Sequence, residues 1–191
     1  MDSVLFDFLS DYMTLSASEK AVLTELSVIR AFKKGTVLLR EGEYTDKGYF
    51  VLKGSLRTYF ILDGEEKTSG FYLELDSYEP EAKVQSSPSR EFLVCSEDCY
   101  LLIANEEMEL RAFAAFPRFE TLCRILTEQA LSSKVSEFNT FRTASPEQRY
   151  LNLLEKRPRL LQRFPQHQIA SYLGMAPQSL SRIRQRLTEK T

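Results

Sequence analysis

Residues 164–184 contain two short amphipathic stretches separated by one glycine. Ile169 and Leu173 are four residues apart, so they lie on one face of a first helix. Gly174 suits the left-handed backbone conformation in which a helix ends abruptly. Pro177 fits the first position of a second helix, where its missing N–H costs nothing. Two short helices joined at a glycine predict a helix-turn-helix.

The second of these helices carries its apolar residues, Leu180, Ile183 and Leu187, at the spacing of a buried helical face. A glutamine amide can bond the N6 and N7 edge of adenine, and an arginine guanidinium can bond the O6 and N7 edge of guanine. An ordinary helical hairpin with a solvated face is the alternative, but the glycine, the prolines and the apolar spacing all agree on the bent pair. The candidate DNA-binding residues are the polar side chains outside the stripe: Gln178, Ser179, Ser181, Arg182, Arg184 and Arg186.

This second helix lacks the usual start signal. Ala176 stands at the N-cap position before Pro177, where a serine or threonine hydroxyl would accept a bond from a backbone N–H. The absent cap costs about 1 kcal/mol. We therefore expect a frayed helix start in the free protein, with DNA phosphates supplying the missing acceptor on binding.

Charge is distributed unevenly along the chain. The 191 residues include 25 basic and 27 acidic side chains, and the net charge of −2 alone argues against a nucleic-acid partner. From Arg142 to the end, however, 10 basic and 3 acidic residues give +7, whereas residues 1–141 carry −9. Because lysine and arginine contacts with phosphate supply most non-specific DNA affinity, the basic end fits the predicted helix-turn-helix.

Residues 35–73 have a different character, with short β-type runs and six of the seven glycines. Asp63-Gly64, between the runs 56–62 and 67–73, predicts a tight hairpin. Short strands joined by tight turns predict a sandwich or barrel. The other predicted strands cover residues 49–52, 91–95 and 99–104, and the predicted helices cover about 5–27 and 106–140.

The predicted helix over residues 106–140 carries a long apolar stripe. Two partners are open for it: the β domain, or the same helix of a second copy. We favour the second copy, because a protein that reads a palindromic site needs a two-fold axis. Ser145 and Pro146 then mark the start of the next helix. The members of the stripe are Phe119, Leu122, Ile125, Leu126, Leu131, Val135 and Phe138, with an interruption near Gln129 and Ser132-Ser133.

Composition disfavours several classes of protein. No apolar run approaches the length of a membrane span and the start of the chain is acidic, so we expect a cytoplasmic protein without a membrane partner. Cys95, Cys99 and Cys123 are expected to be reduced thiols, with no metal site. The only histidine, His167, lies in the predicted DNA-binding segment, which leaves no catalytic residues and predicts no enzyme activity.

In this order of elements the chain resembles, from end to end, the bacterial catabolite-activator-like (Crp/Fnr) family of transcription regulators. The matching stretches are Lys34-Gly35-Thr36, Glu41-Gly42-Glu43, residues 48–54, residues 145–150, Phe164-Pro165-Gln166, residues 169–174 and residues 180–184. The resemblance implies an α+β fold with an N-terminal double-stranded β-helix (a jelly-roll or cupin-like β-roll) as sensor domain. A long linking helix and a C-terminal winged-helix-like helix-turn-helix domain follow. It places the cyclic-nucleotide-binding-like β-roll at residues 1–115, the dimerisation helix at 116–142 and the DNA-binding domain at 143–191.

The resemblance also implies roles and partners. Gln178 and Arg182 fall on positions that read bases, and Ser179 falls on a position that holds phosphate. The implied partners are double-stranded DNA, a second copy bound through the long helix, and RNA polymerase.

The candidate effector pocket departs from the family pattern. Members that bind cyclic nucleotide carry a Gly-Glu pair and an arginine followed by serine or threonine, whereas here residues 73–80 contain no glycine and Glu91 follows Arg90. The candidate pocket residues are Glu74, Arg90 and Glu91. Because carboxylates there repel a phosphodiester, we expect no cyclic AMP binding. The cysteine set of an iron–sulfur regulator and a sensor histidine for haem are also missing from the sequence, so no cofactor is predicted, and we expect a different effector or none.

The sequence leaves two classes of function open. The first is a homodimeric transcription regulator that binds a pseudo-palindromic site with half-sites about 34 Å apart. The second is a small-molecule sensor or interaction module whose DNA-binding end is vestigial.

Overall fold

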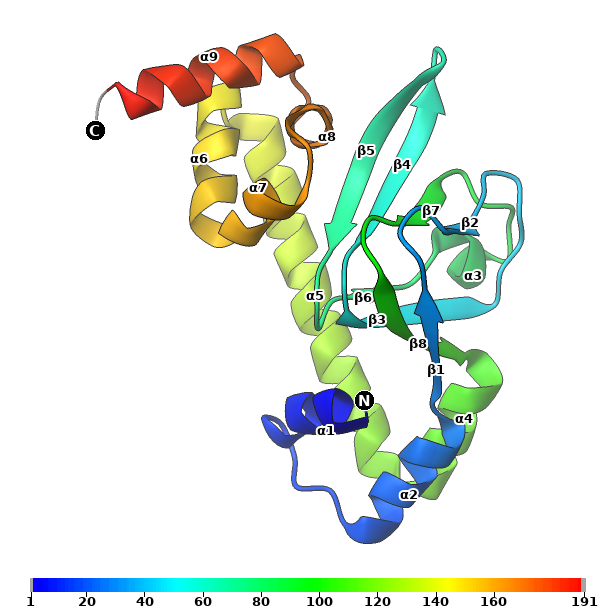
Figure 1. Cartoon of the computed structure of the whole chain (residues 1–191). Helices are drawn as coiled ribbons and strands as arrows, with labels where there is room; N and C mark the ends of the chain where they lie inside the picture. The colour runs from blue at the N-terminus through cyan, green and yellow to red at the C-terminus, as the bar shows by residue number, and fades with distance from the viewer. Residues whose placement is uncertain (1, 190–191) are drawn as a thin grey trace. The chain divides into compact units, whose positions relative to one another are not determined.

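The computed structural model describes residues 2–189 (Figure 1). The chain divides into two compact units. The first comprises Met1–Thr58 and Phe71–Glu128, and the second comprises Tyr59–Gly70 and Gln129–Thr191. The predicted α+β architecture, with an N-terminal β-roll, a long helix and a helical C-terminal region, is confirmed.

The N-terminal segment forms two helices, α1 (Asp2–Ser10) and α2 (Ala17–Leu26). The helical opening predicted for about residues 5–27 consists of these two helices, because a capping box at Ser16 begins the second one. The Ser16 hydroxyl accepts a bond from Glu19 N, and the Glu19 carboxylate accepts one from Ser16 N. This reciprocal pair satisfies two backbone donors that a continuous helix would have bonded internally.

The β-roll consists of two four-stranded sheets, with strand orders β1-β8-β3-β6 and β2-β7-β4-β5. Strand β8 pairs antiparallel with β1, where Arg30 lies opposite Leu101, and also with β3. The core lies between the sheets, where Val51, Leu56 and Leu93 are each completely buried. The strands are β1 (Val28–Phe32), β2 (Val37–Leu39), β3 (Lys47–Lys53), β4 (Leu56–Leu62), β5 (Glu65–Tyr72), β6 (Ser77–Tyr78), β7 (Phe92–Cys95) and β8 (Cys99–Asn105).

The hairpin between β4 and β5 turns at Asp63 and Gly64, as the sequence predicts. Both residues have positive φ angles, 54° and 77°. A two-residue turn with two positive φ angles matches the twist of the flanking strands, and aspartate followed by glycine tolerates that conformation best.

Three helices accompany the later strands: α3 (Glu81–Gln85), α4 (Glu106–Ala115) and α5 (Pro117–Thr143). The single helical region expected over residues 106–140 is divided between α4 and α5. Phe116 adopts an extended conformation at the break. The next residue is Pro117, and a residue that precedes proline is sterically disfavoured in the helical conformation.

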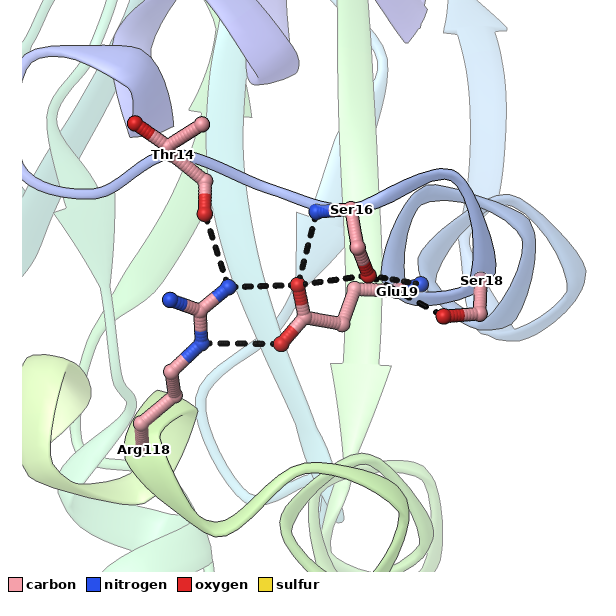
Figure 2. A network of polar contacts seen from close by, with 5 residues as sticks. All are labelled: Thr14, Ser16, Ser18, Glu19 and Arg118. Carbon is pink, nitrogen blue, oxygen red and sulfur yellow. Dashed lines mark hydrogen bonds and ion pairs between the residues drawn. The ribbon is translucent and has the colours of Figure 1, made fainter.

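A polar network joins the start of α5 to the N-terminal segment (Figure 2). Arg118 Nε donates to Glu19 Oε1 at 2.8 Å, and Arg118 Nη2 donates to the carbonyl oxygen of Thr14 at 2.7 Å. The bonds from Arg118, and then the bond from the backbone N–H of Ser16, lower the pKa of Glu19 from 4.5 to about 2. One carboxylate therefore both begins α2 and holds the first turn of α5.

The apolar stripe on α5 is divided between two environments. Leu122 is 5% exposed and packs with Leu5, Leu23 and the partly buried Leu126 in the core beneath the N-terminal helices. Beyond the boundary at residue 128, the members of the stripe are exposed: Leu131 by 63%, Val135 by 51% and Phe138 by 59%.

The C-terminal region consists of α6 (Pro146–Lys156), α7 (Pro158–Arg163), α8 (Gln166–Tyr172) and α9 (Pro177–Thr188). Ser145 caps α6 as predicted, because its hydroxyl accepts a bond from Gln148 N. Leu160, Ile169 and Leu180 are almost completely buried in this region. The family resemblance implies a winged-helix-like domain, and a winged helix contains β-strands. The described residues after α5 form helices and no strand, and the short helix α7 connects α6 to α8. Within residues 2–189, no helix is both long and apolar enough to cross a membrane.

Candidate DNA-binding surface

The turn of the helix-turn-helix is closed by backbone bonds around one glycine. Gly174 has a φ of +66°, and its N–H donates to the carbonyl oxygen of Ser171 at 3.0 Å. Met175 N donates to the carbonyl oxygen of Ala170 at 3.0 Å. This pair of bonds is the Schellman pattern, which ends a helix with a left-handed residue. The predicted role of Gly174 is confirmed.

Helix α9 begins at Pro177 without a side-chain cap, as the sequence indicates. Its N-cap residue is Ala176, which has an extended backbone and no hydroxyl to accept a bond. Leu180 and Ile183 are buried at 1% and 5% exposure, as the predicted stripe requires, and Leu187 is partly buried. The six polar residues that the sequence singled out are all exposed: Gln178, Ser179, Ser181, Arg182, Arg184 and Arg186.

These six side chains differ in how the protein holds them. Arg186 forms an ion pair of 2.9 Å with Glu147 on α6, and Arg184 Nη1 donates to Gln166 Oε1 on α8 at 3.4 Å. A shallow, open hollow of about 500 Å³ lies along one face of α9, and Ser179 and Arg182 are among its lining residues. The surface is therefore a row of amide, hydroxyl and guanidinium groups, with the later two arginines braced from neighbouring helices.

The candidate effector residues of the β-roll have separate surroundings. Glu74 Oε1 accepts a bond from Gly54 N at 3.0 Å. Glu91 Oε1 accepts a bond of 2.7 Å from the hydroxyl of Tyr78, which is 4% exposed. Arg90 is exposed. Burial first, and then the charge of Glu91, raise the pKa of Tyr78, so the tyrosine stays a neutral donor to this carboxylate. An effector pocket at these residues stays a prediction.

The three cysteines belong to no cluster of potential metal ligands among the described residues. Cys95 and Cys99 are both 1% exposed in the β-roll core, and Cys123 is partly buried on α5. Burial raises the pKa of the Cys123 thiol to about 11. Within residues 2–189, no group of three or more His, Cys, Asp or Glu side chains is placed to hold a metal ion.

Sequence patterns missed one residue beside this surface, Arg149 on α6. Its guanidinium contacts the end of α8, the end of α5 and the ring of Phe141. Arg149 lies in one of the stretches that carry the family resemblance, but no spacing rule links residues 149 and 173. Its place in that stretch was the only signal that the sequence offered.

The N-terminal part of the chain matches a known protein family. Residues 29–115 match the family model described as the cyclic nucleotide-binding domain, and this range extends from β1 to the end of α4. This part of the chain is therefore similar to the cyclic nucleotide-binding domain family. No curated protein sequence gave a significant match to the chain.

Solved structures extend the likeness beyond the cyclic nucleotide-binding-type domain. A CooA mutant from Carboxydothermus hydrogenoformans is 15% identical with a TM-score of 0.71, covering 97% of this chain and 84% of its own. FixK2 from Bradyrhizobium japonicum is 20% identical with a TM-score of 0.70, covering 86% of this chain and 85% of its own. The c-di-GMP responsive global regulator CLP from Xanthomonas campestris is 17% identical with a TM-score of 0.68, covering 92% of this chain and 93% of its own. The resemblance to the Crp/Fnr family is thus confirmed at the level of the fold.

Proposed function

We propose that this chain is a sequence-specific, DNA-binding transcription regulator of the Crp/Fnr type. It acts as a homodimer on a pseudo-palindromic site, with residues 1–115 as sensor domain, 116–142 as dimerisation helix and 143–191 as DNA-binding domain. The observation that carries the proposal is the exposed amide, hydroxyl and guanidinium face of α9, which follows a glycine turn of helix-turn-helix geometry. It is not an enzyme, it acts in the cytoplasm, and RNA polymerase is its further partner.

Residues at the start of α9 are assigned to base edges. Gln178 and Arg182 are exposed and four residues apart, so they lie on one face of the helix. Their amide and guanidinium groups match adenine and guanine edges in the major groove. We assign Ser179, Ser181 and the two braced arginines, Arg184 and Arg186, to the phosphate backbone, because such contacts need charge and donors more than a base-specific pattern.

The exposed stretch of α5 is assigned to a second copy of the chain. Leu131, Val135 and Phe138 are more than half exposed and follow the four-then-three spacing of a coiled-coil seam. Lys134 and Glu137, which form an ion pair of 3.1 Å, flank this apolar line. Pairing this face with itself buries three large apolar side chains from each copy and gives the two-fold axis that a palindromic site requires.

Cyclic AMP is not the effector in this proposal. Glu91 follows Arg90 and already accepts a bond from Tyr78, so it adds negative charge where a phosphodiester would have to bind. Isothermal titration with cyclic AMP is expected to give no saturable heat, and thermal unfolding is expected to stay unchanged. A saturable signal in both measurements contradicts this part of the proposal.

Selection from random-sequence duplexes, carried out at two salt concentrations, tests the proposed function directly. A regulator enriches two-fold symmetric sites, and its affinity falls steeply as salt rises because phosphate contacts release counterions. An interaction module with a vestigial DNA-binding end enriches no sequence and binds all duplexes equally weakly. That second outcome overturns the proposal.

The enriched site then allows single contacts to be tested. Arg182→Ala is expected to lose about 1 to 3 kcal/mol on the selected site and little on random DNA, because a base contact carries sequence preference. Arg186→Ala is the matched control, since it removes the same charge from the same helix at a position assigned to phosphate. Equal losses on both duplexes for Arg182→Ala make this residue a phosphate contact instead.

A further inference from the structure

The side chain of Arg149 connects three segments of the second compact unit. Its Nε donates to the carbonyl oxygen of Ala144 at 3.2 Å, in the link between α5 and α6. Its Nη1 donates to the carbonyl oxygen of Leu173, the C-cap residue of α8, at 2.9 Å. Its guanidinium carbon lies 4.1 Å from the centre of the Phe141 ring, near the end of α5. One partly buried cation thus contacts the end of α5, the link between α5 and α6 and the turn of the helix-turn-helix.

This arrangement uses properties that only arginine has. A guanidinium is planar and holds five donors in a fixed geometry, so it can bond two carbonyl groups while its face lies on an aromatic ring. The carbonyl of Leu173 belongs to the last turn of α8, where carbonyl groups have no partner within the helix. Lysine carries its charge at a single point and cannot make both bonds and the ring contact from one position.

The glycine of the turn is packed against the same group. A Cβ atom added at Gly174 would lie 2.8 Å from Phe141 Cζ and 3.2 Å from Arg149 Nη1. Gly174 is therefore favoured by its positive φ, and its missing side chain leaves room for Phe141 and Arg149 to approach the turn. The turn between α8 and α9 rests directly on Phe141 and Arg149.

We infer that Arg149 is a positioning residue for DNA recognition, which fixes the orientation of α8 and α9 relative to the end of α5. The inference assigns Arg149 no contact with DNA. It rests on the proposed function, because the orientation of α9 affects recognition only if α9 binds DNA. Each copy of a symmetric dimer presents one α9. The distance between the two α9 helices varies less when each α9 is held firmly against the end of its own α5. Arg149 therefore sets how sharply the protein discriminates half-site spacing.

The test compares spacing discrimination in the full-length protein and in variants of Arg149. The probes are the selected duplex and the same duplex with one base pair inserted between its half-sites. Wild type is expected to lose about 10-fold or more in affinity on the insertion, because each half-site must meet one reading helix at a fixed distance. For Arg149→Lys and Arg149→Gln, the inserted base pair is expected to lower affinity by about 3-fold or less. A loosened turn accepts either spacing, but it binds the selected duplex more weakly than wild type does.

Two further variants separate positioning from folding and from charge. Phe141→Leu keeps an apolar side chain but removes the ring face, and it is expected to weaken spacing discrimination in the same direction. Lys156→Gln removes one positive charge from the same helix at an exposed position, and it is expected to retain the discrimination of wild type. Thermal unfolding of every variant is followed in parallel, and affinities are compared well below the lowest midpoint, where all variants are folded.

The outcomes distinguish this inference from the function on which it depends. If wild type enriches no duplex, the proposed function fails before any variant is compared. If wild type discriminates spacing, and folded Arg149→Lys and Arg149→Gln discriminate it equally well, the positioning role is overturned while the proposed function stands. Arg149 is then only a stabilising residue.

Discussion

The two compact units of this chain use their polar and apolar groups differently. In the first unit, the carboxylates of Glu19, Glu74 and Glu91 accept bonds from within the chain, and the start of α2 is capped from both sides. In the second unit, six polar side chains of α9 are exposed and the N-terminus of α9 has no side-chain cap. These three carboxylates of the first unit are bonded internally, whereas the first turn of α9 in the second unit has no side-chain acceptor for its backbone N–H groups.

The same difference appears within the single helix α5. Leu122 packs in the core of the first unit at 5% exposure, whereas Leu131 belongs to the second and is 63% exposed. Both leucines lie on one apolar stripe, so the periodicity of the sequence does not distinguish them. A continuous stripe can thus stabilise the fold in one stretch and leave an exposed apolar face in the next.

The largest expected effect comes from placing charge on the exposed stretch of α5. The double variant Leu131→Glu/Val135→Glu is expected to be monomeric in sedimentation velocity. It is expected to bind the selected duplex about 100- to 10,000-fold more weakly, because each half-site is then bound without the effective concentration that the dimer supplies. Thermal unfolding is expected to show a folded protein.

A matched control isolates the apolar face from the added charge. Ser132→Glu/Ser136→Glu introduces the same two charges at the same spacing, one position further around the helix. This control is expected to stay dimeric and to retain affinity. If both double variants stay dimeric, the exposed stripe is not the dimer interface and the comparison between the two stretches fails.

A smaller effect is expected in the buried stretch of the same helix. Leu122→Ala is expected to lower the free energy of unfolding by about 2 to 5 kcal/mol, because it leaves a cavity among Leu5, Leu23 and their neighbours. Leu131→Ala, made in a Val135→Glu background that disrupts pairing of the exposed stretch, removes the same atoms from an exposed position and is expected to change stability by about 0.5 kcal/mol or less. Urea denaturation measures both, and equal losses would contradict the assignment of the two stretches to different environments.

Local rules predicted the features that depend on a few neighbouring residues. Asp63-Gly64, Gly174 and the Ser145 cap follow from backbone preferences, and the structure has all three. The ion pair between Glu19 and Arg118 joins residues that are 99 positions apart, so no spacing rule reveals it. The bond between Arg149 and the carbonyl oxygen of Leu173 joins residues 24 positions apart, so no local pattern reveals it either.

The apolar stripe of α5 shows a second limit of sequence patterns. Periodicity identifies which side of a helix is apolar, but it does not identify what covers that side. The sequence left two partners open for the whole stripe, the β domain or a second copy. The first stretch packs inside its own unit, and only for the second stretch does the question of a second copy arise.

The uncapped start of α9 gives a test of the first-turn N–H groups that have no side-chain acceptor in the second unit. Ala176→Ser is expected to raise the free energy of unfolding by about 1 kcal/mol, because the new hydroxyl accepts a bond from the first turn. Affinity for the selected duplex is expected to stay level or fall, since the cap then occupies donors that a phosphate would otherwise use. Ser145→Ala is the reverse control, which removes an existing cap and is expected to lose about the same stability. A rise in DNA affinity for Ala176→Ser contradicts this use of the helix start.

The smallest expected effect concerns the Glu19 network, and it appears as a change in pH dependence. The pKa of Glu19 is lowered from 4.5 to about 2 in the folded protein, so its ionised form is stabilised by folding. Its contribution is complete above the unfolded value of 4.5 and is lost as the pH falls toward 2. The stability difference between wild type and Glu19→Gln is therefore expected to be constant above about pH 5.5 and to shrink below it.

Two variants show whether Arg118 is responsible for this behaviour. Arg118→Gln removes the largest cause of the lowered pKa but leaves the bond from Ser16 N, so its unfolding is expected to lose the larger part of the acid dependence that Glu19→Gln loses. Glu25→Gln is the control, because it removes the same charge from the same helix without touching the network. If Arg118→Gln keeps the acid dependence of wild type, the first turn of α5 is not held through this carboxylate. The first unit would then lack one of the internal bonds that distinguish it from the second.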